Sequence, residues 1–389
     1  MQMAIDVGGF SAGESDQLRQ AMGSKRSKER MERLHERFAA GATARGVEPT
    51  VIEQIWEKLA AFANYGFPES HSVSFAYLVY SSSWLKRYEP AAFCAGLLNA
   101  QPMGFYSPHS LVQDARRHGV EVRTPDLNAS GWQATLEVDG PLAERPGPDV
   151  APEHWGRGGP AVRLGIASVR GIGDDLAKEI DAGRPYASME DLVRRVPALT
   201  LASLEALATA GAFGCFALDR RAALWAAGAV AQSKPDRLDG IVTGAVAPAL
   251  PGLSDREAAN ADLWATGVSP DGHPTRFVRA HLDAIGVLPA ARLGEAEAGT
   301  KVVVAGVVTH RQRPATAAGV TFVNLEDETG LINVICSKGC WARYRRVVGS
   351  CPALLVRGRL ERSEGVTNIV AEVIEPLPLG APSRSRDFR

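Results

Sequence analysis

The sequence predicts a multidomain α+β protein in which all-α segments precede a five-stranded β-barrel. Apolar residues recur at helical spacing through most of residues 11–231, whereas residues 301–377 change to short β-branched runs of period two. The 389 residues are enough for two to four domains. The pattern divides the chain into a helical segment (1–125), a linker or edge segment (126–160), a helix-hairpin-helix domain (161–232), a connector (233–299), an OB-fold (300–377) and a tail (378–389).

The first segment begins with amphipathic runs. Met31, Leu34 and Phe38 recur at spacings of three and four, so they share one face of a helix. Pro49 suits the first turn of a second helix, because the N–H group that proline lacks would have no partner there. The mostly apolar run 75–85 predicts a third helix. Residues 1–125 are therefore expected to be all-α.

The segments on either side of the helix-hairpin-helix domain differ from it in composition. A short strand is expected at residues 133–138, and Gly and Pro are dense in 141–160, where no periodicity remains. The latter stretch predicts a mobile loop. In the connector, turn residues surround a single predicted helix at 255–265.

Two glycines at 171 and 173 indicate a DNA-binding hairpin. Gly171 and Gly173 follow the apolar Val169, a pattern typical of two short helices joined by a tight turn. Glycine lets backbone N–H groups approach a phosphate, and the dipole of the following helix favours an anion. Arg170, Gly171, Gly173 and Lys178 are the predicted DNA contacts. A plain helical turn with a glycine cap is the alternative.

A second, degenerate copy of this motif is expected at residues 204–224. Gly211 follows an apolar run there, and Arg220 and Arg221 come next. Two packed copies would hold a duplex backbone without reading its sequence. Arg220 and Arg221 are therefore predicted DNA contacts as well.

The barrel is predicted from the order of its strands. The strand-like runs are 302–308, 320–325, 332–335, 353–360 and 369–373, with a helical piece at 338–347 after the third. This order is that of an OB-fold, a barrel that binds single strands through basic and aromatic side chains or docks proteins. The basic candidates are Arg311, Arg313, Arg357 and Arg359. Of the aromatic candidates Phe322 and Trp341, Phe322 lies in an apolar run and is expected in the core.

Charge and cysteine content limit the function classes. The formal net charge is −1, but residues 19–37 carry seven Lys or Arg against three Glu, and residues 301–389 carry thirteen against eight acids. Such local basic faces can bind phosphate. No apolar run reaches the length of a membrane helix and no signal peptide is visible, so a cytoplasmic protein without a membrane partner is expected.

The five cysteines are scattered, which indicates free thiols in a reducing compartment. Cys336, Cys340 and Cys351 are close enough in sequence to leave a metal-binding module as an alternative. Zinc sites usually have four ligands in tight pairs, and a fourth is not apparent. The expectation is buried structural thiols and no bound metal.

The carboxylate pattern of a two-metal enzyme is missing from the sequence. Such enzymes cluster carboxylates around ions roughly 3.5–4 Å apart. The pair 174–175 lies in the predicted hairpin, and the acidic run 326–328 lies at a predicted strand turn. Neither resembles a strand-borne Asp-x-Asp with apolar flanks, and the phosphate-loop and nucleophile-elbow motifs are missing too. No catalytic residue is therefore predicted.

Several runs taken together resemble the fingers of the bacterial C-family DNA polymerases, the alpha subunits of DNA polymerase III. They are LRQAMGSKR (18–26), NYGF (64–67) with SHS (70–72), and AAF (91–93) with LL (97–98). The runs QPMGFYS (101–107), ADLWATGVS (261–269) and SRDFR (385–389) resemble the error-prone, damage-inducible type within that family. The resemblance covers essentially the whole chain.

The resemblance implies that residues 1–125 are the C-terminal part of the fingers. Arg19, Lys25, Arg26 and His71 would then lie toward the incoming deoxynucleoside triphosphate, although Gln20 stands where the family has a second arginine. Without the resemblance, His71 would be taken as a helix-capping residue. The resemblance also implies a catalytic palm upstream of Met1, so Mg²⁺ would belong to the intact polymerase and this chain alone would be inactive and bind no cofactor.

The implied partners are DNA, as primer–template duplex and template strand, and the accessory proteins of a mutagenesis complex. Replicative relatives carry a clamp-binding peptide after the hairpin region, and residues 249–254 lack its glutamine and phenylalanine. Contact with the sliding clamp is therefore expected to be weak or indirect. A stand-alone, non-catalytic DNA-binding or scaffold protein is the alternative function.

Overall fold

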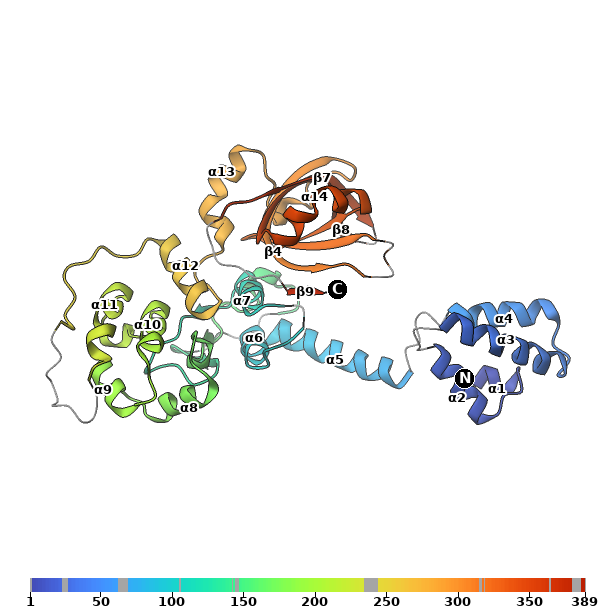
Figure 1. The fold of residues 1–389 in the computed structure, drawn as a ribbon, viewed down its shortest axis with the longest axis horizontal. Coiled ribbons are helices and arrows are strands. Elements are labelled where there is room, and N and C mark those ends of the chain that lie inside the picture. The colour runs from blue at the N-terminus through green and yellow to red at the C-terminus, as the bar shows by residue number, and fades with distance from the viewer. Residues whose placement is uncertain are drawn as a thin grey trace. The chain divides into compact units, whose positions relative to one another are not determined.

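The protein is described by a computed structural model and divides into two compact units, residues 1–82 and 83–389 (Figure 1). The structure describes residues 2–22, 27–61, 69–104, 106–141, 143, 147–233, 244–314, 317, 319–363, 365–379 and 386–388.

The first unit is all-α, as predicted. Its helices are α1 (Gln2–Asp6), α2 (Ala12–Met22), α3 (Ser27–Thr43), α4 (Pro49–Ala61) and the greater part of α5 (Glu69–Tyr88). Phe38 is fully buried, and its ring lies 6.1 Å from that of Phe10 and 5.4 Å from that of Trp56. This aromatic cluster is the centre of a small core that includes the predicted Met31.

The second unit starts with the end of α5, followed by α6 (Pro90–Asn99) and α7 (Pro108–Arg117). A small sheet of order β1-β3-β2 follows, built from β1 (Val122–Arg123), β2 (Thr135–Glu137) and β3 (Ala161–Arg163). The strand expected at 133–138 is confirmed as β2. The other two strands have only two and three residues, too few to show a period in the sequence.

A helical core comes next. It is formed by α8 (Asp174–Ala182), α9 (Met189–Arg195), α10 (Leu201–Ala210), α11 (Arg220–Val230) and α12 (Asp255–Thr266). Ser188, Thr200, Asp219 and Ser254 each accept a hydrogen bond from a first-turn N–H group at the start of α9, α10, α11 and α12. These side chains satisfy donors that the helix itself leaves unpaired, which explains where the four helices begin.

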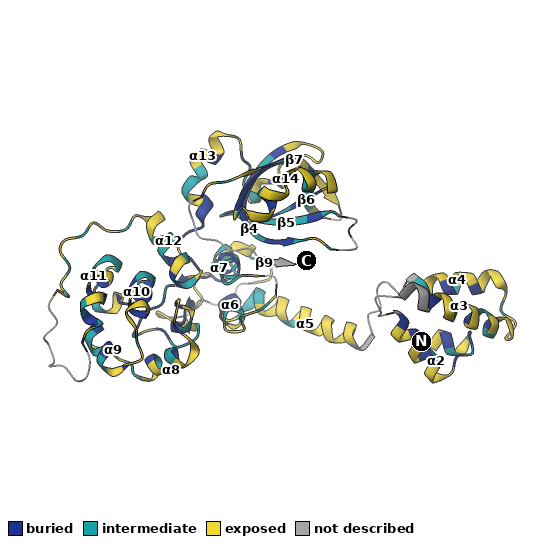
Figure 2. Cartoon of the chain, viewed as in Figure 1, coloured by how far each residue is buried: buried dark blue, intermediate teal, exposed yellow. Residues whose placement is uncertain are grey.

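The barrel follows α13 (Arg279–Ala284). Its strands are β4 (Lys301–Gln312), β5 (Thr321–Glu326), β6 (Leu331–Cys336), β7 (Ala353–Ser363) and β8 (Val366–Pro376), with α14 (Lys338–Ser350) between β6 and β7. The order β5-β6-β8-β7-β4 closes because β4 also pairs with β5. The predicted OB-fold is thereby confirmed. Figure 2 shows the buried residues along its strands and in the helical cores.

One expectation about the barrel region is wrong, and one segment has a structure that the sequence did not indicate. Phe322 is half-buried and lies outside the barrel core, because β5 alternates and Val323 and Leu325 take the inward positions. The predicted polar tail contains a strand, β9 (Arg386–Phe388), which pairs in parallel with residues 310–312 of β4. A three-residue strand is recognisable only from its partner.

The barrel depends on one close backbone approach. A Cβ atom at Gly358 would lie 2.3 Å from the carbonyl oxygen of Val370, beside the bulge where β7 and β8 shift register. We expect Gly358→Ala to lower the free energy of unfolding by about 1–3 kcal/mol, since the strands must separate to admit the methyl group.

Chemical denaturation followed by circular dichroism measures the effect of Gly358→Ala. The matched control is Gly349→Ala in α14, where a Cβ atom meets nothing within 4 Å. The control should be neutral or stabilising by up to about 1 kcal/mol because alanine favours helix. Equal effects of the two substitutions would contradict the interpretation.

Candidate nucleic-acid interface

The predicted hairpin at residues 166–177 is present, but its first helix is a single 3₁₀ turn, Ile166–Ser168. Gly171 has φ +77°, and Gly173 is the N-cap of α8. No side chain caps α8, and a Cβ atom at either glycine would meet nothing within 4 Å. The first-turn N–H groups of α8 therefore face open space, where a phosphate oxygen can accept from them.

Both predicted cations of the hairpin lie over tryptophan rings. The Arg170 guanidinium is 4.9 Å from the Trp264 ring centroid, and the Lys178 ammonium is 4.7 Å from that of Trp132. Both cations are exposed. The ring attracts a cation and restricts its motion while leaving its hydrogen-bond donors available. Sequence reasoning missed the two tryptophans, because they lie far from the hairpin along the chain.

The second hairpin copy has two helices around Gly211, which caps α10 with φ +81°. Its cations have partners on α12. Arg220 donates to Asp262 at 2.6 Å, and Arg221 donates to Glu257 at 3.1 Å. Burial raises the pKa of Asp262 to about 6, against the opposite effect of Arg220. These contacts join α11 to α12, so a DNA role for the two arginines stays a prediction.

The four predicted barrel cations lie in different environments. Arg311 is buried and donates to the Val348 and Cys351 carbonyl oxygens. It therefore links β4 to the C-terminal end of α14. Arg313 lies over the Trp341 ring at 5.2 Å. Arg357 and Arg359 are exposed. Each of these two lies 3.9 Å from a glutamate, Glu375 for the first and Glu372 for the second.

The predicted nucleotide-side residues belong to α2, α5 and the stretch between α2 and α3. Arg19 is exposed and pairs with Asp16 at 2.9 Å. Lys25 and Arg26 lie outside the described residues. His71 is exposed on the first turns of α5, as are the large apolar side chains of Val73 to Tyr80. A contact of these residues with a nucleotide stays a prediction.

The outward face of the barrel carries residues that sequence reasoning missed. Asn324, Asn333 and Asn368 stand in one row across β5, β6 and β8, and Asn324 donates to Asn333 at 2.9 Å. Phe322 and Ile335 face each other in the next row. The polar–apolar alternation of the strands was the available signal, but it does not fix the register that aligns the three amides.

The acidic run 326–328 is occupied by protein donors. Glu326 is 1% exposed and accepts from Ser110 at 2.8 Å and Arg117 at 3.0 Å, both on α7. Asp327 accepts backbone N–H groups from its own turn and from Ala290. Glu328 pairs with Arg279 and also accepts from Thr275. All three carboxylates therefore hold other segments against the barrel.

The cysteines of the barrel belong to its interior. Cys336 is buried in the core, and Cys340 and Cys351 pack against it. In the part of the chain that the structure describes, no group of three or more His, Cys, Asp or Glu side chains is placed to hold a metal ion. Nor is any described helix long and apolar enough to cross a membrane.

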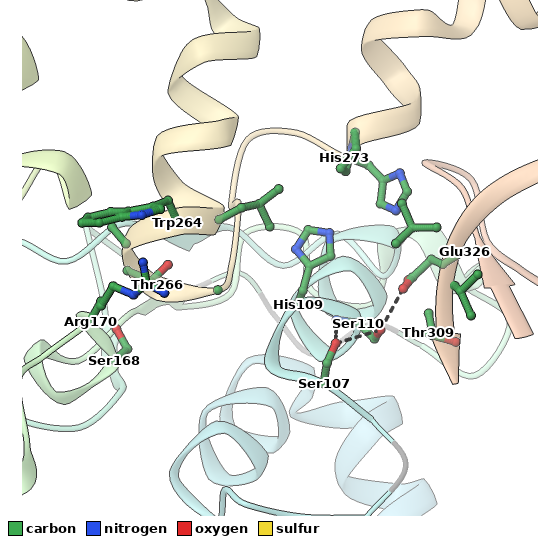
Figure 3. A pocket seen from close by; sticks show the side chains of 16 residues that line it. Ser107, His109, Ser110, Ser168, Arg170, Trp264, Thr266, His273, Thr309 and Glu326 are labelled. Carbon is green, nitrogen blue, oxygen red and sulfur yellow. Dashed lines mark hydrogen bonds between the residues drawn. The ribbon is translucent and has the colours of Figure 1, made fainter. Parts of the chain in front are cut away.

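A cavity of about 490 Å³ lies where α7, α12, the hairpin and β4 meet (Figure 3). Arg170 lines one side, and Thr309 and Glu326 line the other. His109 and His273 stack at 5.6 Å, and the Nε2 atoms of both are buried without a hydrogen-bond partner among the described residues. Burial lowers the pKa of His109 to about 4 and that of His273 well below its usual value.

Three regions of the chain are similar to domains of known proteins. Three family models match the chain: the bacterial DNA polymerase III alpha subunit finger domain at residues 1–46, a helix-hairpin-helix motif at 119–223 and an OB-fold nucleic acid binding domain at 302–377. Over its full length the chain is 56% identical to error-prone DNA polymerases of Mycolicibacterium paratuberculosis and Mycobacterium tuberculosis, and 57% identical to that of Nocardia farcinica.

Over its whole length, the chain is homologous to one part of the error-prone DNA polymerases. The matched region is all of this chain but only 34%, 34% and 33% of the three relatives, so the chain spans about a third of their length. The resemblance drawn from the sequence is confirmed. The hairpin and the barrel, which match two of these models, line the same cavity.

The α7–barrel contact can be tested at Glu326. We expect Glu326→Ala to lower the free energy of unfolding by on the order of 3 kcal/mol, because Arg117 and Ser110 lose their acceptor in a buried place. Glu372→Ala is the control, since Glu372 is more exposed and pairs with Lys301 at the surface; it should cost less than about 1 kcal/mol. Denaturation curves of both variants check this, and similar losses would contradict it.

The histidine pair predicts an acid-sensitive fold. In the unfolded chain, a histidine takes up a proton near pH 6.5, whereas folded His109 takes one up only near pH 4. The contribution of His109 to the free energy of unfolding is therefore fully present above about pH 7 and is lost as the pH falls from about 6.5 to about 4. We expect His109→Gln to remove this part of the pH dependence, which amounts to up to about 3 kcal/mol of the free energy of unfolding. Melting temperatures from pH 8 to pH 4 measure it. Exposed His281→Gln should keep the wild-type slope, and an unchanged slope in His109→Gln would contradict the prediction.

Proposed function

We propose that this chain is the C-terminal part of an error-prone DNA polymerase, which performs template-directed synthesis past lesions. The chain contributes the end of the fingers, a duplex-binding hairpin domain and an OB-fold. The supporting observation is identity of 56–57% over the whole chain to relatives named error-prone DNA polymerase. The expected partners are a primer–template duplex, its template strand, a deoxynucleoside triphosphate and accessory proteins of a mutagenesis complex.

The hairpin is the best-supported duplex contact. The open first-turn N–H groups of α8, just after Gly171 and Gly173, can donate to one phosphate, and Arg170 and Lys178 supply charge nearby. The exposed acids Asp174 and Asp175 make the first turn of α8 negative. The backbone N–H groups and the two cations must therefore outweigh this repulsion. Such a contact would be independent of base sequence.

The described carboxylates do not fit the paired Mg²⁺ ions that the family's chemistry uses. The acidic run 326–328 is occupied by protein donors, and no other described cluster fits a metal. We therefore place the metal-binding carboxylates of the intact enzyme outside this chain. Primer extension by this chain with Mg²⁺ and all four nucleotides should give no product. Robust extension would favour a complete catalytic site here.

Duplex binding tests the hairpin directly. Arg170→Ala with Lys178→Ala should weaken binding of a short duplex about tenfold or more and reduce the slope of log K against log salt by roughly 2, one for each lost phosphate contact. Fluorescence anisotropy at several salt concentrations measures both quantities. The control is Arg292→Ala, an exposed arginine paired with Glu295 beside the barrel. Equal losses in the control would show a non-local charge effect instead.

A further inference from the structure

Two thiols meet where β6 passes into α14. Cys336 is the last residue of β6, belongs to the barrel core and is fully buried. Cys340 lies in the first turn of α14 and packs against the same core, but its side chain is only half-buried. Its backbone N–H donates to the Ser337 hydroxyl at 3.2 Å, which fixes this turn of the helix. One thiol of the pair is therefore enclosed, and the other is within reach of small molecules from solvent.

The two thiols are joined by a hydrogen bond in which Cys336 donates to the sulfur of Cys340. This bond raises the pKa of the Cys336 thiol, and burial raises it further. It lowers the pKa of Cys340 against the opposing effect of burial, and the Arg343 guanidinium lowers it as well. The N-terminal end of a helix also favours an anion. Cys340 is thus the member of the pair that ionises, and the thiolate is the reactive form of cysteine.

The other three cysteines lack this arrangement. Cys94 is buried, donates to the Leu111 carbonyl oxygen, and has its pKa raised to about 12 by burial. Cys215 is exposed, but it donates to the Ala212 carbonyl oxygen and partial desolvation raises its pKa. Cys351 follows the far end of α14, roughly 16 Å along the helix from Cys340. Within the described residues, the thiol pair is therefore formed by Cys336 and Cys340.

We propose that Cys336 and Cys340 form a redox modification site, at which a peroxide converts the two thiols to a disulfide. This inference is independent of the proposed DNA binding. The Cys340 thiolate attacks one oxygen of hydrogen peroxide, the O–O bond breaks, hydroxide leaves, and a sulfenic acid forms on Cys340. The Cys336 sulfur then attacks the Cys340 sulfur, the S–O bond breaks, and the departing hydroxide takes up the Cys336 proton as water.

The electrons and protons of this sequence balance. The two thiols together lose two electrons and two protons, and one hydrogen peroxide gains them and becomes two waters. The enclosed position of Cys336 suits the second step, because its thiol already points its proton at the sulfur that it must attack. A thiol reductant such as dithiothreitol would reverse the modification, since sulfenic acids and disulfides are both reducible by thiols.

The test uses the full chain, treated with hydrogen peroxide, alkylated and digested with trypsin. Lys338 lies between the two cysteines, so trypsin separates them, and the disulfide joins peptide 339–343 to the peptide that ends at Lys338. Mass spectrometry should find this linked pair in the treated protein and lose it after dithiothreitol. Exposed Cys215 should be oxidised at least about tenfold more slowly, because less of it is thiolate.

Three variants assign the roles. In C336S, Cys340 should still react, and its sulfenic acid should persist and be trapped by dimedone, since the second thiol is gone. In C340S, Cys336 should stay reduced, because it is buried and has lost the thiol that reacts first. C351S is the matched control in the same core and should form the linked pair at the wild-type rate within about twofold. Melting temperatures confirm that each variant is folded.

Several outcomes would overturn the inference. They are wild-type protein that forms no linked pair, a disulfide to Cys351 in its place, oxidation of Cys215 as fast as that of Cys340, and oxidation of Cys336 in folded C340S. The wild-type measurement decides the first three even where a variant fails to fold. Since none of these measurements involves DNA, their failure would leave the proposed function unchanged.

Discussion

Three consecutive carboxylates, at the end of β5 and in the turn to β6, bind three other segments of the second unit to the barrel. Glu326 fixes α7 through Ser110 and Arg117, Asp327 fixes the segment at Ala290, and Glu328 fixes Arg279. Each carboxylate is buried or nearly so, so each needs its donors to offset the loss of water. The positions of α7, α13 and the cavity relative to the barrel follow from this one turn.

The same turn also explains how the hairpin domain and the barrel are connected. α7 lies against Glu326 on one side, and Gln113 of α7 donates to the Ser269 carbonyl oxygen just after α12 on the other. α12 in turn meets α11 through Asp262 and accepts the Arg170 backbone N–H at Ala265. A chain of buried polar contacts therefore runs from the barrel to the hairpin. Acids that could suggest catalysis in the sequence serve this alignment instead.

Most of the fold could be predicted from the sequence. The helical periods predicted the helices, the five β-branched runs predicted the OB-fold, and the hairpin glycines predicted the turn before α8. Three strands were not predicted from the sequence, and they share one cause. β1, β3 and β9 are too short to carry a period, and their pairing depends on partners far along the chain.

The candidate site was less predictable for the same reason. Arg170 and Lys178 could be chosen from their position beside the glycines, but the tryptophans under them come from distant segments. Arg220 and Arg311 have the same residue type as the exposed candidates, yet the fold turns them toward protein acceptors. The asparagine row needs a register between three strands that residue type alone does not set.

The strand at 386–388 affects whether a strand of another chain can pair with this edge of the barrel. β7 pairs with β4 only as far as Val307, so residues 310–312 of β4 would present an unpaired edge beyond it. Such edges accept foreign strands, both in specific peptide recognition and in aggregation. Because β9 fills this edge, an incoming peptide must first displace it. Within the described residues, β9 therefore occupies the backbone hydrogen-bonding positions on this edge that a foreign strand would need.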